Sequence, residues 1–306
     1  MGLFDKFKKK KTDNDTDAVK QDLNNRNEHD GWVFLVHLLF REKPEMPTKE
    51  YMSEVMQKHL GNETECFSHN YELAGFAAKK YKTVFKEGPM PPQLMITKAF
   101  STDEMKIDQI MRSQMWDCPE SESILRECKY HIVANDMMAA GLDSAERAEM
   151  LTNYIEALAE MFPNCEAMLF RPSGKMYKRE EIVSCNVPFK QRFIYYAVNV
   201  RFFNIQDTND MVIDSLGMSV LGLPDVQYHF HGLDPNEVVN HAYNVLLYIF
   251  ENDCPIKNGE TVDGIKGGEM SREVHWKCQF EDALIQPART VMDICPNEFA
   301  AGGRNG

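Results

Sequence analysis

Two histidines stand two residues apart in Tyr228-His-Phe-His-Gly232, the pattern in this chain that comes nearest to metal chemistry. On a strand, the side chains of His229 and His231 point to the same face, about 6–7 Å apart by the rise per residue. Two such imidazoles can be two metal ligands, with His275 or Asp225 as the third. The pattern fits two roles: the centre of a metal-assisted hydrolase, or half-buried rings that pack as aromatics.

A second candidate site lies in the apolar segment 196–203, which contains one arginine. If residues 194–203 and 212–220 form a hairpin around the polar loop 206–210, paired residue numbers sum to about 415. Arg201 then lies opposite Asp214, and we predict a cross-strand ion pair that fixes the register, because a buried arginine needs a partner. The functional alternative is an anion-binding pocket that uses Arg201 and Asn199.

Asp234 lies beside the histidines and carries the carboxylate that acid–base chemistry needs. The sequence explains it without catalysis, because Asp234-Pro-Asn-Glu237 combines an N-cap aspartate, a first-turn proline and a glutamate three residues after the cap. We predict that Asp234 caps a helix that extends to about residue 251.

Motifs of better-defined chemistry are missing from the sequence. The chain has no phosphate-binding P-loop, no Gly-x-Ser-x-Gly elbow and no His-Glu-x-x-His. We therefore expect no cofactor.

The charge balance narrows the range of partners. The chain has 306 residues, is 43% hydrophobic, and carries 34 basic against 47 acidic residues, a net charge of −13. Such a protein has the composition of a globular protein and repels phosphate backbones. We expect it to bind another protein and no nucleic acid; the sequence does not predict its oligomeric state.

The cysteines and the first residues bear on location. Eight cysteines are dispersed along the chain, no two of them two residues apart, which disfavours zinc ribbons and predicts reduced, mostly buried thiols. The sequence shows neither a signal peptide nor a membrane-spanning run, so we expect a cytoplasmic protein.

One segment offers a route to a membrane. Leu3, Phe4 and Phe7 fall on one helical face and are followed by a lysine run that begins at Lys8. The segment is either a weak surface-seeking helix or a solvated tail.

Hydrophobic periodicity places these residues on an α+β scaffold. Residues 32–171 alternate predicted strands and helices, with helix starts at Thr48, Ser101 and Asp143. After an irregular stretch at 172–190, strands are predicted at 194–203, 212–220, 225–231, 274–280 and 290–294. We predict mixed or antiparallel sheets covered by helices, with two ferredoxin-like or similar βαβ-containing halves.

Composition and element order give four segments. Residues 1–30 are predicted to be a disordered basic and polar leader, and residues 300–306 a loose tail. Between them we expect an N-terminal α/β half at 31–172 and a C-terminal strand-rich α+β half at 173–299.

Several short motifs of the second half occur together in one known family. They are Val198-Asn-Val-Arg-Phe-Phe-Asn204, Asp214-Ser-Leu-Gly-Met218, Leu221-Gly-Leu-Pro-Asp-Val-Gln227, Gly232-Leu-Asp-Pro235, Gly259-Glu-Thr-Val262, Trp276-Lys-Cys-Gln279 and Pro287-Ala-Arg289. With these motifs the chain resembles the bacterial family catalogued as domain of unknown function 4261, most densely over 193–295. The resemblance implies a bacterial, cytoplasmic α+β protein and assigns no residue a role.

These observations favour a non-catalytic intracellular binding or interaction protein, such as an immunity-type inhibitor or a regulatory module. An acidic protein attracts basic partners by electrostatic steering. The alternatives are the metal-assisted hydrolase centred on His229 and His231, and an envelope-associated structural protein held by its basic N-terminus.

Overall fold

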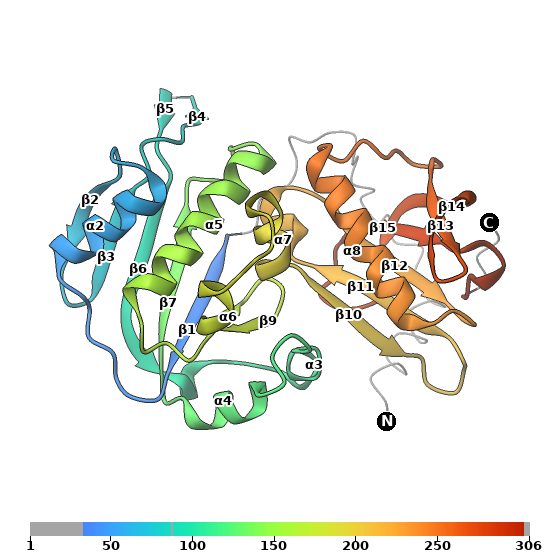
Figure 1. Ribbon diagram of the computed structural model, residues 1–306, viewed down its shortest axis with the longest axis horizontal. Coiled ribbons are helices and arrows are strands. Elements are labelled where there is room, and N and C mark those ends of the chain that lie inside the picture. Colours follow the sequence, from blue (N-terminus) through green and yellow to red (C-terminus); the bar gives the residue numbers. More distant parts are fainter. Residues whose placement is uncertain (1–32, 87, 303–306) are drawn as a thin grey trace. The chain divides into compact units, whose positions relative to one another are not determined.

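The computed structural model describes residues 33–86 and 88–302 (Figure 1). The predicted leader, with Leu3, Phe4, Phe7 and Lys8, lies outside these residues, as does the end of the predicted tail. The described residues form seven α-helices and three mostly antiparallel sheets, which confirms the predicted α+β class. None of the helices in this part of the chain combines the length and apolarity needed to cross a bilayer.

The described residues divide into two compact units. The seven-stranded unit contains residues 33–86, 88–199 and 217–222, and the six-stranded unit contains residues 200–216 and 223–302. The division falls after residue 199 and not at the expected 172, because the stretch at 172–190 is not irregular. It forms β9 (Lys175–Lys178), which pairs with β8 (Ala167–Phe170), and α6 (Arg179–Val183).

The seven-stranded sheet has the order β2-β3-β6-β7-β1-β8-β9, with every neighbouring pair antiparallel. Its other strands are β1 (Leu35–Phe40), β2 (Glu65–His69), β3 (Leu73–Ala77), β6 (Gln93–Ser101) and β7 (Tyr130–Met137). A small hairpin, β4 (Thr83–Phe85) with β5 (Gly88–Met90), stands apart from the sheet.

Two long helices connect strands of this sheet. The helix α2 (Lys49–Leu60) follows β1, and α5 (Ser144–Met161) links β7 to β8, which run in the same direction on either side of β1. Figure 1 shows both helices over one face of the sheet. Thr48 and Asp143 cap them as predicted. The unit therefore contains the βαβ crossovers that the sequence indicated.

Strand β1 separates two different environments. Val36, Leu38 and Phe40 are fully or almost fully buried, and the Phe40 ring meets Phe162 at the end of α5. Alternate residues face the other side. There Leu39 packs in a cluster with Ile124 of α4 (Ser121–Glu127), whereas residues further along this face are only half-buried.

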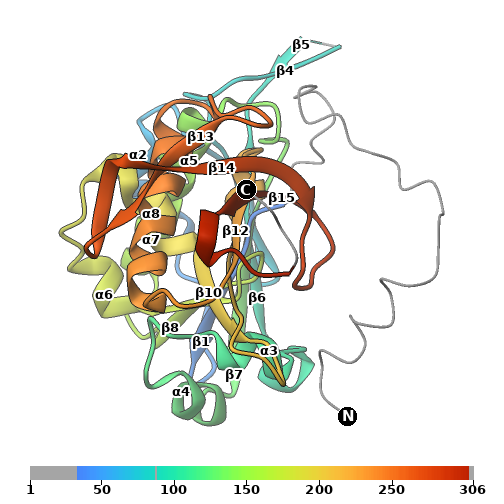
Figure 2. The same cartoon turned by 90° about the vertical axis from the view of Figure 1, so that its right-hand side faces the viewer.

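The six-stranded sheet has the order β10-β11-β12-β15-β14-β13. Its strands are β10 (Asn199–Asn204), β11 (Met211–Leu216), β12 (Asp225–Phe230), β13 (Thr261–Lys266), β14 (Glu269–Asp282) and β15 (Thr290–Cys295). Strand β12 runs parallel to β15. The helix α8 (Pro235–Glu251) packs against this sheet (Figure 2), and the hydroxyl of Tyr228 hydrogen-bonds His241 Nδ1 at 2.9 Å.

Three local predictions need correction. The capping signal at Ser101 opens only a short 3-10 turn at 102–104, followed by the short helix α3 (Gln109–Ser113). The predicted strand at 194–203 begins as α7 (Arg192–Ala197), and only its second half is β10. In the predicted loose tail, Ala300 bridges to Phe230 and Ala301 is buried.

Asp234 caps α8 as predicted. Its Oδ1 accepts the Asn236 N–H at 2.8 Å, and Pro235 begins the helix. We expect Asp234→Ala to lower the free energy of unfolding by about 1 kcal/mol, because a first-turn N–H loses its acceptor. Chemical denaturation measures this loss, with Asp282→Ala, at the exposed end of β14, as the control. An equal loss in both variants would contradict the capping role.

Candidate functional site

The predicted ion pair between Arg201 and Asp214 is present. These residues lie on the neighbouring strands β10 and β11. The guanidinium of Arg201 donates two hydrogen bonds to the carboxylate of Asp214, from Nε to Oδ1 at 2.9 Å and from Nη2 to Oδ2 at 2.5 Å. Both side chains are buried. Two parallel hydrogen bonds of this kind fix orientation as well as charge.

A second arginine, which the sequence did not place, completes the network. Arg289 Nη2 donates to Asp214 Oδ2 at 2.7 Å and to the Ser215 carbonyl at 2.7 Å, and its Nε lies 3.3 Å from Asp225 Oδ2. Burial alone lowers the pKa of this guanidinium, but the charges and hydrogen bonds of Asp225 and Asp214 outweigh burial and raise it. The sequence signal that could have found Arg289 is the motif Pro287-Ala-Arg289, which the chain shares with the family it resembles.

The network ties an irregular segment to the sheet. Arg289 Nη1 donates to the carbonyls of Ile285 and Pro287, Arg201 Nη1 donates to the Gln286 carbonyl, and the Leu284 N–H donates to Gln227 Oε1. Every guanidinium nitrogen of both arginines thus donates at least one hydrogen bond to a protein acceptor. This arrangement holds the β14–β15 connection in place.

Asn199, the other candidate for an anion pocket, is also engaged. It belongs to the seven-stranded unit, where its Nδ2 donates to the carbonyls of Gln114 at 3.0 Å and Ser173 at 3.3 Å. The shared anion pocket with Arg201 stays a prediction.

The two histidines lie at the end of β12. His229 is nearly buried, with Nε2 3.8 Å from Asp210 Oδ2, and the His231 N–H donates to the Phe299 carbonyl. Of the suggested third ligands, Asp225 is bound to Ser215 and Arg289, and His275 is exposed on β14. Among residues 33–86 and 88–302, no group of three His, Cys, Asp or Glu could hold a metal. The metal role stays a prediction.

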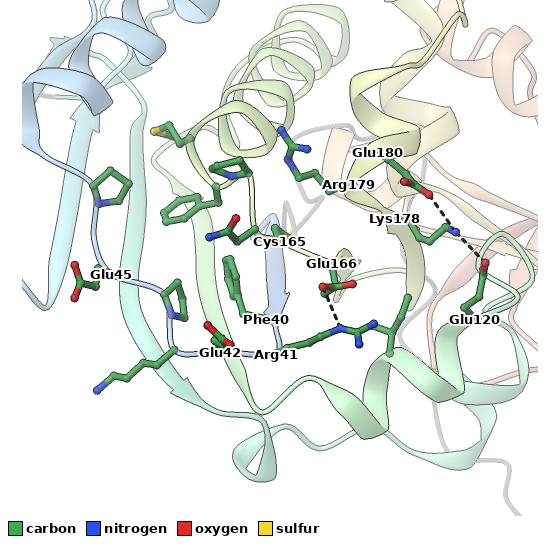
Figure 3. Close-up of a pocket in the computed structure, with 18 of the residues that line it drawn as sticks. Phe40, Arg41, Glu42, Glu45, Glu120, Cys165, Glu166, Lys178, Arg179 and Glu180 are labelled. Atoms are coloured by element: carbon green, nitrogen blue, oxygen red, sulfur yellow. Dashed lines mark hydrogen bonds and ion pairs between the residues drawn. The ribbon is translucent and has the colours of Figure 1, made fainter.

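A groove of about 1130 Å³ opens in the seven-stranded unit, where β1 ends (Figure 3). Four segments line it: residues 40–47 after β1, 120–124 of α4, 161–166 after α5, and 178–180 at the start of α6. Phe40 and Phe162, which are almost fully buried, lie at its edge. Sequence reasoning missed this groove, because its walls come together from four distant loops.

Most charges on the groove walls are paired with each other. Arg41 bridges to Glu127 at 3.0 Å and to Glu166 at 3.1 Å, and Lys178 lies between Glu120 at 2.9 Å and Glu180 at 3.2 Å (Figure 3). The hydrogen bonds of Glu120 and Glu180 raise the pKa of Lys178, and Lys178 lowers the pKa of Glu120.

The one cysteine of the groove is held as a thiol. Cys165 Sγ lies 3.2 Å from the Ala167 carbonyl, and burial raises the pKa of this thiol to about 12. Thiolate is the reactive form of cysteine, so the structure gives Cys165 a packing role.

The segment after β1 is different, because nothing in the described chain occupies its polar groups. Glu42, Lys43 and Glu45 are exposed and make no ion pair with a described residue. The backbone C=O groups of residues 42–46, and the N–H groups of all these residues except Pro44, likewise form no hydrogen bond within residues 33–86 and 88–302. Pro44 and Pro47 bias Lys43 and Met46 towards extended backbone.

The fold and the groove define an α+β protein with an open polar groove beside its seven-stranded sheet. Residues 214–295 match the model of the family described as "Domain of unknown function (DUF4261)", which confirms the resemblance for that segment. The match contains Asp214, Asp225 and Arg289 of the buried network. No curated protein and no solved structure matches the chain.

Proposed function

We propose that this protein is a non-catalytic binding protein whose groove holds an extended segment of a basic partner protein. The observation that carries the proposal is the run of unbonded backbone groups at residues 42–46 on the groove wall. A partner segment laid along this wall gains main-chain hydrogen bonds, as when a strand is added to an exposed edge.

The charges favour a basic segment. Two of the three unpaired charged residues on this wall, Glu42 and Glu45, are acidic, and the whole chain has a net charge of −13. An acidic surface steers a basic partner towards the groove, and this attraction weakens as salt increases.

Peptide selection followed by proline substitution tests the proposal. Peptides selected from a displayed random library should carry lysine or arginine and bind the protein in fluorescence anisotropy. Successive N–H groups of an extended chain point to opposite sides. We therefore place one proline at Glu42 and another at Glu45, so that one N–H is removed from each side of the segment. We expect one proline variant to bind about tenfold more weakly than its alanine counterpart, the effect of one lost hydrogen bond.

Glu42→Ala and Glu45→Ala are the matched controls, because each removes the same carboxylate and keeps the N–H. Circular dichroism checks that all four variants are folded. If both proline variants bind the selected peptides as tightly as their alanine controls, the backbone of this wall is not the binding surface and the proposal fails.

A further inference from the structure

Three basic side chains belong to the face of the seven-stranded sheet that carries Leu39, and the charge of Arg171 acts on both imidazoles. His37 is on β1, His131 lies on β7 opposite Leu39, and Arg171 directly follows β8, where its N–H donates to the Leu35 carbonyl at 2.9 Å. The two imidazole rings are 4.7 Å apart between centroids. Neighbouring side chains, Val133 among them, are only partly buried, so solvent reaches this part of the sheet.

Arg171 has little to balance its charge. Its guanidinium contacts Met111 Sδ at 3.4 Å, and no carboxylate in the described chain lies within ion-pair distance. Burial lowers the pKa of Arg171, because it outweighs the more distant attraction of Asp108. Half-buried cations are normally paired, so the guanidinium has donors for a group that this part of the chain does not supply.

His37 adds a neutral donor beside this cation. Burial, with contributions from His131 and Arg171, lowers the pKa of His37 to about 3, so its ring is uncharged at neutral pH. Its Nδ1 is buried and has no hydrogen-bond partner within the described residues. A buried N–H without an acceptor is costly, so we assign the ring proton to Nε2, where it can be donated to a ligand.

We infer that Arg171 and His37 form a binding site for a small oxyanion, a carboxylate or a phosphate. The planar fork of a guanidinium matches two oxygens of either group, and His37 Nε2 donates to the same ligand. A metal cation fits poorly, because the fixed charge of Arg171 repels it. Glu104 and Asp108 also act on this cluster, so hydrogen bonding and not net charge provides the selectivity.

Nuclear magnetic resonance of the imidazole nitrogens tests the site directly. The full chain is titrated with sodium phosphate in one arm and sodium acetate in the other, at ionic strength held constant with chloride. We expect the His37 nitrogens to shift and saturate. Arg171→Met should weaken the binding by about 10–100-fold, the range for a lost charged hydrogen bond, and Arg171→Lys should weaken it less.

Arg126→Met is the control, because Arg126 is exposed on α4 and paired with Glu127. It should titrate like the unaltered protein. Saturation in the acetate arm alone or the phosphate arm alone supports the site and decides which oxyanion it prefers. The inference is overturned if His37 shifts in neither arm, or if Arg171→Met and Arg171→Lys both titrate like the unaltered protein.

Discussion

Replacing Arg289 with methionine is expected to lower the free energy of unfolding by about 3–5 kcal/mol, the usual cost of breaking a buried ion pair. The substitution removes the partner that Asp225 and Asp214 share, at 3.3 Å and 2.7 Å. Both carboxylates are buried, and Arg201 bonds Asp214 but not Asp225. The loss therefore reflects a buried carboxylate left without its counter-charge, which exceeds the net value of the original pair.

Urea denaturation measures this effect, since a shift in midpoint at constant slope reports a change in stability. Arg289→Lys is the informative second variant. It keeps the charge but has too few donors to reach two carboxylates and three carbonyls, so we expect an intermediate loss. If Arg289→Met costs less than about 1 kcal/mol, the value of an ordinary hydrogen bond, the network does not support the fold.

The sequence could predict the part of this network that depends on local pairing. Arg201 and Asp214 lie 13 residues apart on consecutive strands, and the two-residue alternation of a strand with the position of a polar loop is enough to bring them together. The cap of α8 could also be predicted from the sequence, because Asp234 accepts a hydrogen bond from the N–H of Asn236, only two residues away.

The rest of the network depends on contacts between distant segments. Arg289 is 75 residues from Asp214, and it arrives there because β15 pairs in parallel with β12. Two parallel strands are joined by a long crossover and not by a tight turn. No short turn motif in the sequence therefore reveals which strands pair. The cluster of His37, His131 and Arg171 was hidden because its strands, although antiparallel, are far apart in the sequence and become neighbours only when the sheet forms.

One local prediction failed for a different physical reason. Residues 194–197 have strand-forming side chains, yet they form the end of α7, where Phe193, Ile194 and Tyr196 are buried. Packing of these apolar side chains overrides intrinsic preference in so short a segment. The groove was also hidden, since residues 41–47 show no periodicity and their role depends on the loops that stand opposite them.

A second large effect is expected from Asp293, a fully buried carboxyl in the middle of the six-stranded sheet. It lies on β15 opposite Gln227 and Gln279, and Gln227 Nε2 donates to its Oδ1 at 3.2 Å. Burial raises the pKa of Asp293 from 3.8 to about 7, against the opposing effect of the Gln227 hydrogen bond. The folded protein therefore holds a proton on Asp293 at pH values where the unfolded chain has released it.

The sign of the pH dependence follows. Between pH 3.8 and about 7 the folded state binds more protons than the unfolded state, so this group makes the protein less stable as pH rises through that window. At pH above about 7 the full penalty is present, at most about 4 kcal/mol for a shift of this size. Asp293→Asn cannot ionise, so its stability relative to the unaltered protein should increase from pH 4 to pH 8.

The stability difference between Asp293→Asn and the unaltered protein, measured at each pH, separates the effect of Asp293 from that of groups whose contribution to stability increases with pH. Burial lowers the pKa of His37, His131 and His241, which favours the folded state as pH rises. Those histidines contribute equally to both proteins, so they cancel in the comparison, which is made by urea denaturation at each pH. A stability difference that stays constant across the whole range would show that Asp293 is already ionised in the folded protein, and the six-stranded sheet would then have to hold a buried negative charge at its centre.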